Sequence, residues 1–92
     1  MTPSALHVFV EGMVQGVGFR QATLREARAR NLRGWVRNLN DGRVEAWFEG
    51  HDTQLDSMLD WCRRGPALSE VRSVEHSRQQ ATGSASSFEI KF

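Results

Sequence analysis

The stretch from residue 33 to residue 50, RGWVRNLNDGRVEAWFEG, constrains the fold most, because Asp41-Gly42 lies between two runs of strand-forming residues. An Asp-Gly pair in that setting is among the strongest short signals for a tight β-hairpin. Apolar and polar residues alternate in the second run, which is typical of a strand with one buried face. The alternating residues are Val44, Ala46 and Phe48 on one side and Glu45, Trp47 and Glu49 on the other.

One strand and one helix are predicted before this hairpin. Residues 6–12, LHVFVEG, alternate with the two-residue period of a strand. Residues 19–30 follow a glycine-rich turn and contain good helix formers without Gly or Pro. Asn31 then stands where a helix ends, because Asn accepts the left-handed conformation that closes many helices. The residues expected on the buried side of this helix are Phe19, Ala22, Thr23 and Ala27, with the stem of Arg30.

A second helix is predicted after the hairpin. Asp52 or Thr53 is placed to cap its start, and Gly65-Pro66 ends it. Apolar residues recur between them with helical spacing, which predicts one buried side. These residues are Leu55, Met58, Leu59 and Cys62.

The last part of the chain contains two further strand patterns. Residues 70–78, EVRSVEHSR, give a weak one, and the small polar residues 79–87 are expected to form a loop or a hairpin tip. Residues 88–92, FEIKF, alternate again, which predicts a short terminal strand. We expect its apolar side chains to point one way; they are Phe88, Ile90 and Phe92.

The order of these patterns predicts the fold class. It is β-α-β-β-α-β with a short strand appended, in a chain of 92 residues, which suits one domain with one core. Such an order is typical of an α+β, ferredoxin-like βαββαβ sandwich, in which two helices cover one face of an antiparallel sheet. No linker or internal repeat divides the chain, so we expect residues 1–92 to form a single domain.

Composition argues against several classes of protein. Hydrophobic residues make up 39% and charged residues 25%, as in globular proteins. The net charge of +1 gives no reason to expect nucleic-acid binding, and we interpret Trp35, Trp47 and Trp61 as core and sheet-face packing. No segment reaches the ~20 apolar residues of a membrane span, and the N-terminus has no basic leader. We therefore expect a cytoplasmic monomer with no nucleic-acid or membrane partner.

Cysteine and histidine residues do not indicate a metal site. Cys62 is the only cysteine, so it can form neither an internal disulfide nor a Cys-rich zinc site, and we expect it in the core. His7, His51 and His76 are not spaced as metal ligands. The sequence thus predicts no metal site.

The glycine-rich turn between the first strand and the first helix has the features of an anion site. Glycines allow consecutive backbone N–H groups to point into one concavity, beside the free N–H groups of the helix start. The stretch lacks the Gly-Lys-Ser/Thr of nucleotide triphosphate loops and the third glycine of the dinucleotide fingerprint, where Gln21 stands. The residues predicted to bind a phosphate-like anion are Gln15, Gly16, Val17, Gly18, Phe19 and Arg20.

Arg20 is the residue that most favours this interpretation. A cation is disfavoured at a helix start by ~0.3–1 kcal/mol, but a bound anion would reverse the sign of that effect. A guanidinium can also bind an oxyanion through two parallel hydrogen bonds. The alternative left open by these residues is that Gly16 and Gly18 serve only a tight turn, while Arg20 points into water.

Together the motifs GMVQGVGFR, GWVRN and DGRVE resemble the acylphosphatase family, and the resemblance runs over nearly the whole chain. Acylphosphatases are small ferredoxin-like enzymes that hydrolyse acyl phosphates, such as acetyl phosphate, without a metal. The resemblance implies a small-molecule acyl phosphate as substrate and no cofactor. It also implies that Arg20 binds the phosphoryl group with the backbone of residues 15–20, and that Asn38, the last residue of GWVRN, holds the attacking water.

The chain departs from the common pattern of that family in several places. Many members have an aromatic residue just after the loop arginine, an apolar residue at position 30 and a glycine at position 31, so these departures bear on the packing of the first helix. Some members have hydroxyl residues after the catalytic Asn, so their replacement bears on catalytic efficiency. The departing residues are Gln21, Ala22, Arg30, Asn31, Leu39 and Asn40.

Three other interpretations stay open from the sequence. Asn38 could serve only as a turn former at a strand end. The chain could be a non-catalytic ferredoxin-like module that binds an anion or regulates a partner. It could also be related to the acylphosphatase-like domain of the large carbamoyltransferases that mature hydrogenases, although those proteins continue into zinc-finger-like cysteines and this sequence stops at Phe92. We expect a freestanding enzyme, whose natural acyl group the sequence does not specify.

Overall fold

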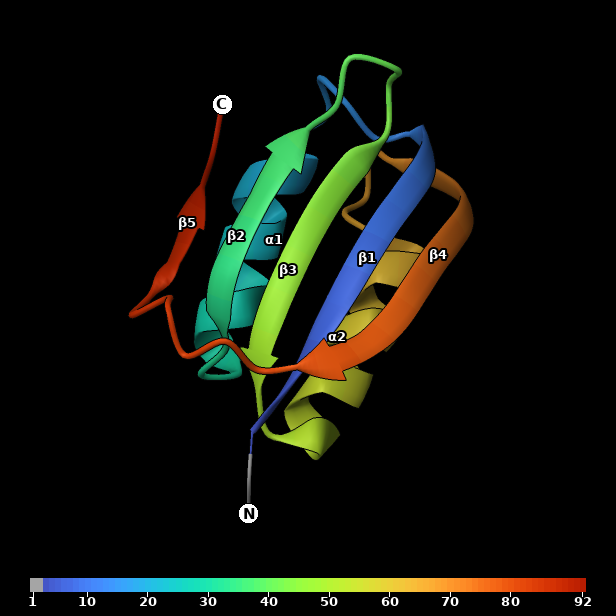
Figure 1. The fold of residues 1–92 in the computed structure, drawn as a ribbon. Coiled ribbons are helices and arrows are strands. Elements are labelled where there is room, and N and C mark those ends of the chain that lie inside the picture. Colours follow the sequence, from blue (N-terminus) through green and yellow to red (C-terminus); the bar gives the residue numbers. More distant parts are fainter. Residues whose placement is uncertain (1–2) are drawn as a thin grey trace.

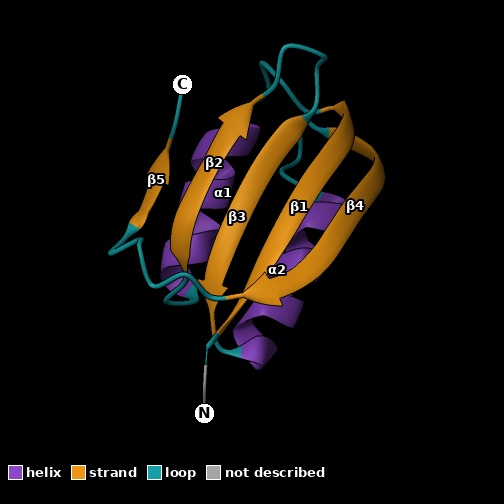
Figure 2. Ribbon diagram, in the orientation of Figure 1, coloured by secondary structure: helices purple, strands orange, loops and turns teal. Residues whose placement is uncertain are grey.

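The structure is a computed structural model that describes residues 3–92. Within these residues, two helices lie on one face of a five-stranded sheet (Figures 1 and 2). The predicted α+β, ferredoxin-like fold is confirmed. The strands are β1 (Ser4–Met13), β2 (Arg33–Asn38), β3 (Val44–Gly50), β4 (Glu70–Gln80) and β5 (Phe88–Ile90), and the helices are α1 (Phe19–Ala29) and α2 (Asp52–Arg64).

The sheet is mixed, whereas the sequence predicted an antiparallel one. Its order is β4-β1-β3-β2-β5, and the first four strands pair antiparallel. The appended strand β5 pairs parallel to β2, with Gly34 beside Phe88 and Val36 beside Ile90. The segment after β4 crosses one end of the sheet to the opposite edge, so β5 runs in the same direction as β2 (Figure 1).

Helix α1 packs as its apolar spacing predicted. Arg30 follows the helix and donates from Nε to the Ser57 hydroxyl at 2.9 Å and from Nη1 to the Glu26 carboxylate at 2.8 Å. These bonds let an arginine replace an apolar residue between α1 and α2. Asn31 has φ 57°, which confirms the left-handed end of the helix. The buried residues of α1 are Phe19, Ala22, Thr23 and Ala27.

The connection between β2 and β3 is wider than a tight hairpin turn. β2 ends at Asn38 and β3 begins at Val44, so the loop runs from Leu39 to Arg43. The backbone N–H of Leu39 donates to the carbonyl of Arg43 at 2.8 Å, and the Asp41 carboxylate accepts from the backbone N–H of Arg43 at 3.1 Å. The Asp41 side chain therefore stabilises a loop longer than the Asp-Gly pair alone predicted.

The predicted cap of α2 is wrong. His51 occupies the N-cap position, and no side chain caps the helix within residues 3–92. Asp52 is already helical, and its carboxylate accepts a hydrogen bond of 2.8 Å from Arg78 on β4. The Asp52 side chain, which the local pattern predicted as a cap, instead forms a long-range ion pair with Arg78.

Strand β3 buries residues on both faces, although its alternation predicted one buried face. Val44, Ala46 and Phe48 belong to the core under the helices. Glu45 and Glu49 are also buried, on the face that carries no helix. Both carboxylates accept hydrogen bonds from neighbouring side chains on that face, and these side chains cover them.

Glu49 fixes the segment that leads to β5. Its carboxylate accepts hydrogen bonds from Trp47 Nε1 at 2.7 Å, from the Thr82 hydroxyl at 2.6 Å and from the backbone N–H of Gly83 at 3.0 Å. Burial alone would raise the pKa of Glu49, but these bonds favour the charged form and hold its pKa below 4.5. A charged side chain thus stabilises the crossing from β4 to the opposite edge.

A bulge explains the weak pattern of β4. Val71 and Val74 are three residues apart, which breaks the period of a strand. The register with β1 shifts between Glu11 and Gly12, so that Val74 pairs with Val10 while Val71 pairs with Gly12. The extra residue returns both valines to the core side, where they pack against the buried cluster.

Candidate active site

The loop between β1 and α1 has the left-handed backbone that its glycines predicted. Gly16 has φ 76° and Gly18 has φ 81°, a region that other residues rarely adopt. A Cβ atom at either position would meet nothing within 4 Å, so the backbone conformation, and not space, requires glycine. Within residues 3–92, α1 has no side-chain cap and no acidic residue in its first turn. The helix start therefore keeps the N–H groups and partial positive charge that bind anions.

Two apolar side chains of the loop anchor it and point away from the predicted anion site. Phe19 is buried, and its ring centroid lies 5.4 Å from that of Trp61 on α2. Val17 is partly buried and packs against the same core. These residues can contribute only backbone groups to the site.

Gln15 connects the loop to the residues that follow Asn38. Its side-chain amide donates one hydrogen bond to the carbonyl of Leu39 at 2.7 Å and another to that of Arg43 at 2.9 Å. The turn after β2 is thereby held against the glycine-rich loop. The sequence placed Gln15 in the anion site, and the structure gives its side chain this linking position.

Arg20 is half-buried at the start of α1, and its guanidinium has no ion pair or hydrogen bond with the described residues 3–92. Its Cζ atom lies 5.1 Å from the centroid of the Phe92 ring. All five N–H donors of the guanidinium are therefore uncommitted to a carboxylate, as binding of an oxyanion requires.

Asn38 lines a pocket of about 280 Å³, here called the Asn38 pocket. Its Oδ1 atom is buried and has no hydrogen-bond partner among residues 3–92. A buried acceptor without a partner is costly, and such atoms are rare outside functional sites. The residues that line this pocket are Arg37, Asn38, Leu39, Asn40 and Phe92.

Phe92 lies beside both predicted catalytic residues, Arg20 and Asn38. The sequence did not identify it as a site residue. Its ring contacts Arg20, and the residue lines the Asn38 pocket. The alternation of FEIKF predicted that it would point the same way as Phe88, but β5 ends at Ile90, and Phe92 is exposed whereas Phe88 is buried. No strand pairing holds the chain in the alternating geometry beyond Ile90. Phe92 could be placed beside Asn38 only from the parallel register between β2 and β5, which the sequence pattern did not predict.

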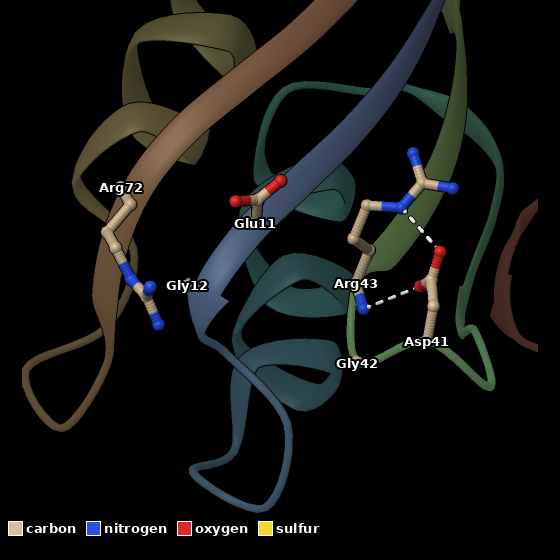
Figure 3. A pocket seen from close by; sticks show the side chains of 6 residues that line it. All are labelled: Glu11, Gly12, Asp41, Gly42, Arg43 and Arg72. Atoms are coloured by element: carbon tan, nitrogen blue, oxygen red, sulfur yellow. Dashed lines mark hydrogen bonds and ion pairs between the residues drawn. The ribbon is translucent and has the colours of Figure 1, made fainter.

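A second pocket of about 310 Å³, here called the hairpin pocket, contains none of the predicted site residues (Figure 3). Its Asp41 carboxylate accepts hydrogen bonds from the backbone N–H and the guanidinium of Arg43. The backbone hydrogen bond is the largest cause that holds the pKa of Asp41 below its usual value. Two charged residues of this pocket, Asp41 and Arg43, are thus paired with each other within the turn. The lining residues are Glu11, Gly12, Asp41, Gly42, Arg43 and Arg72.

Residues 3–92 contain no group of three or more His, Cys, Asp or Glu side chains that could hold a metal ion. His7 instead meets Glu45 at 2.7 Å on the face of the sheet without helices. No helix in this part of the chain is long and apolar enough to cross a membrane. Trp61 is buried in the core, and Trp35 and Trp47 are half-buried beside His7 on the sheet face, as predicted.

Comparison with known proteins tests the resemblance carried by the sequence motifs. The Acylphosphatase family model matches residues 6–90, nearly the whole chain. The chain belongs to the acylphosphatase family. An acylphosphatase of Haloquadratum walsbyi is 49% identical to it over 82 residues, which are 89% of this chain and 88% of that protein.

Solved acylphosphatases have the same fold. The crystal structure of acylphosphatase from Bacillus subtilis matches with a TM-score of 0.93 and 35% sequence identity, covering 97% of this chain and 99% of that one. HypF from T. kodakarensis matches with a TM-score of 0.83 and 32% identity, but the match covers only 12% of that chain. The acylphosphatase fold thus also occurs as a small part of a longer protein.

Proposed function

We propose that the protein hydrolyses the carboxyl–phosphate bond of acyl phosphates without a metal. In this proposal the backbone of residues 15–20 and the guanidinium of Arg20 bind the phosphoryl group, and Asn38 positions the attacking water. The observation that carries the proposal is that Asn38, whose Oδ1 is buried and unpartnered among the described residues, lines a pocket together with Phe92, the residue whose ring contacts the guanidinium of Arg20.

The proposed reaction needs few titratable side chains. The water oxygen forms a bond to phosphorus while the bond from phosphorus to the acyl oxygen breaks, which releases a carboxylate and phosphate. A carboxylate is a good leaving group, so positioning and charge stabilisation matter more than a strong general acid. Arg20 and the loop N–H groups would neutralise charge on the non-bridging oxygens of the phosphoryl group.

Asn38 would orient the water without deprotonating it. The side-chain amide can accept a hydrogen bond from water through its oxygen, but it is not a base at neutral pH. The proton of the attacking water must therefore pass elsewhere, and we propose a non-bridging oxygen of the substrate phosphate as its acceptor.

Hydrolysis of benzoyl phosphate in the presence of EDTA, followed by absorbance, tests this function. We expect turnover by the intact protein that the chelator leaves unchanged. Absence of turnover by folded protein that still binds inorganic phosphate would favour the alternative, a non-catalytic anion-binding module. A loss of rate in EDTA that added magnesium or zinc restores would contradict the metal-free mechanism.

We also propose that residues 1–92 act as a single-domain, cytoplasmic monomer. One buried cluster contains residues from both helices and from β1, β2, β3 and β5, and Val71 and Val74 of β4 pack against it, which supports a single core. The thiol of Cys62 is free and buried, as is usual in a reducing compartment. Light scattering of the purified protein tests the monomer, and a concentration-dependent dimer mass would contradict it.

A further inference from the structure

Arg20 differs from five other arginines of this chain in how its guanidinium is held. The centroid of the Phe92 ring lies 5.1 Å from the Cζ atom of Arg20, and within residues 3–92 no carboxylate pairs with it. Ion pairs with carboxylates hold several other guanidinium groups. Those paired arginines are Arg30, Arg37, Arg43, Arg63 and Arg78.

The backbone next to Phe92 is held against β2. The parallel register pairs Val36 with Ile90, so its continuation brings Phe92 next to Asn38. The backbone N–H of Lys91 donates to the carbonyl of Val36 at 2.8 Å, and the Lys91 ammonium lies 5.2 Å from the Trp35 ring centroid. Phe92 therefore lies at the edge of the Asn38 pocket, with its side chain exposed.

An aromatic ring and a carboxylate would hold Arg20 with opposite consequences. A carboxylate would take up N–H donors and neutralise the positive charge, so it would compete with a phosphoryl group. The face of a phenyl ring attracts the cation but accepts hydrogen bonds only weakly. The ring of Phe92 can thus orient the guanidinium and leave its charge and its donors available.

We propose that Phe92 is a positioning residue that orients the Arg20 guanidinium toward the phosphoryl group through a cation–π contact. The inference rests on the proposed function, because it requires Arg20 to bind phosphate. A cation–π contact at an exposed site changes an equilibrium by about 2- to 5-fold. Loss of the ring should therefore weaken phosphate binding by about that factor.

Calorimetric titration with inorganic phosphate at constant ionic strength tests the inference on a series of Phe92 variants. Phe92→Trp keeps a π face and should bind phosphate at least as tightly as the intact protein. Phe92→Leu keeps an apolar side chain without a π face, and Phe92→Ala removes both; we expect both to weaken binding by about 2- to 5-fold. Phe92→Glu should weaken it further, because its carboxylate pairs with Arg20, and added salt should reduce that extra loss.

The KM for benzoyl phosphate should rise by the same factors as the phosphate Kd, with a smaller change in kcat. Leu68→Ala is the matched control, because Leu68 is an exposed apolar residue that lines neither pocket described above. Urea unfolding of each variant checks that the fold is intact.

Two results would overturn the inference. One is Phe92→Leu binding phosphate as tightly as the intact protein, which would reduce the contact to apolar packing. The other is an unchanged Kd across the whole series while Arg20→Ala weakens binding by about 10-fold or more. Failure of the proposed function looks different: the intact protein would not hydrolyse benzoyl phosphate, or Arg20→Ala would still bind phosphate with unchanged affinity.

Discussion

The side-chain amide of Gln15 donates a hydrogen bond of 2.7 Å to the carbonyl of Leu39, the residue that directly follows Asn38. Gln15 belongs to the glycine-rich loop, and Leu39 lines the Asn38 pocket. One side chain thus connects the part of the molecule proposed to bind phosphate with the part proposed to position water. The distance between those two parts should depend on it.

Gln15→Ala should lower both stability and activity. It removes the donors of two carbonyl groups, those of Leu39 and Arg43, at a cost of about 1–3 kcal/mol in the free energy of unfolding. A small displacement of Asn38 relative to the loop should lower kcat/KM by about 10-fold. Urea unfolding and benzoyl phosphate hydrolysis measure the two effects. Gln79→Ala is the control, since Gln79 bonds only to the exposed Ser77 hydroxyl, and an equal loss there would contradict the linking role of Gln15.

Arg20 and Asn38 should have separable roles. Arg20→Ala removes a charged, two-donor contact and should weaken phosphate binding by about 10- to 100-fold, with a matching loss of turnover. Asn38→Ala should bind phosphate normally and lower kcat by about 100- to 1,000-fold. Calorimetry and steady-state kinetics separate the two. Arg25→Ala, on the exposed side of α1, makes the same change in net charge and should leave both measurements unchanged. Phosphate binding lost in Asn38→Ala would refute this division of roles.

Stability should fall in acid partly because Glu49 becomes protonated. Burial alone would raise its pKa, but hydrogen bonds from Thr82 and Trp47 lower it below the ordinary value of 4.5. A carboxyl group whose folded pKa is lowered contributes stability that is fully present above pH 4.5 and is lost as the pH falls through the folded pKa. The midpoint of urea unfolding, measured from pH 6 down to about pH 3, should therefore decrease most below pH 4.5.

Glu49→Gln should flatten this pH dependence and lower stability at pH 7 by about 1–3 kcal/mol, because the donors of Trp47, Thr82 and Gly83 lose a charged acceptor. Some pH dependence should remain from Glu45. Burial raises the pKa of Glu45, but hydrogen bonds from His7 and Arg37 outweigh that effect and lower it. Glu75→Gln, an exposed carboxylate on β4, is the control. An unchanged slope in Glu49→Gln would refute this assignment.

Cys62 should be unreactive in the folded protein. Burial raises the pKa of its thiol to about 12, so only about one molecule in 10,000 carries the thiolate at pH 8. An aromatic disulfide reagent should label it only after unfolding in urea, and the labelling rate should follow the unfolding equilibrium. Rapid labelling in buffer alone would mean that α2 opens locally.

The sequence predicted most of what local periodicity determines. The buried positions of α1 follow from helical spacing, and the left-handed end of that helix follows from Asn31. Both are properties of neighbouring residues, which a pattern records directly.

The errors concern pairing between distant residues. Alternation in FEIKF shows that Phe88 faces the core, but it cannot show which strand lies beside it or in which direction that strand runs. Asp52 fits a cap locally, yet it lies in the first turn of α2, and its carboxylate pairs with Arg78 from β4. The same limitation hid Phe92, whose place depends on the register between β2 and β5.

The roles of Arg20 and Asn38 stay predictions, as do those of the loop residues. Motif resemblance identified these residues, and no contact with substrate tests them. The structure supplies the geometry that makes the assignments testable, with Gln15 and Phe92 connecting the two parts of the site.

The short strand β5 has a consequence for how the site behaves in time. Three residues pair with β2 at the outer edge of the sheet, whereas β1 pairs with neighbours on both sides. Edge elements with few hydrogen bonds open far more often than the centre of a sheet, so the amide of Lys91 should exchange with solvent sooner than those of β1. Each such opening would remove Phe92 from Arg20 while the rest of the molecule stays folded. The phosphate affinity measured in solution would then be an average over an edge that is closed and an edge that is briefly detached.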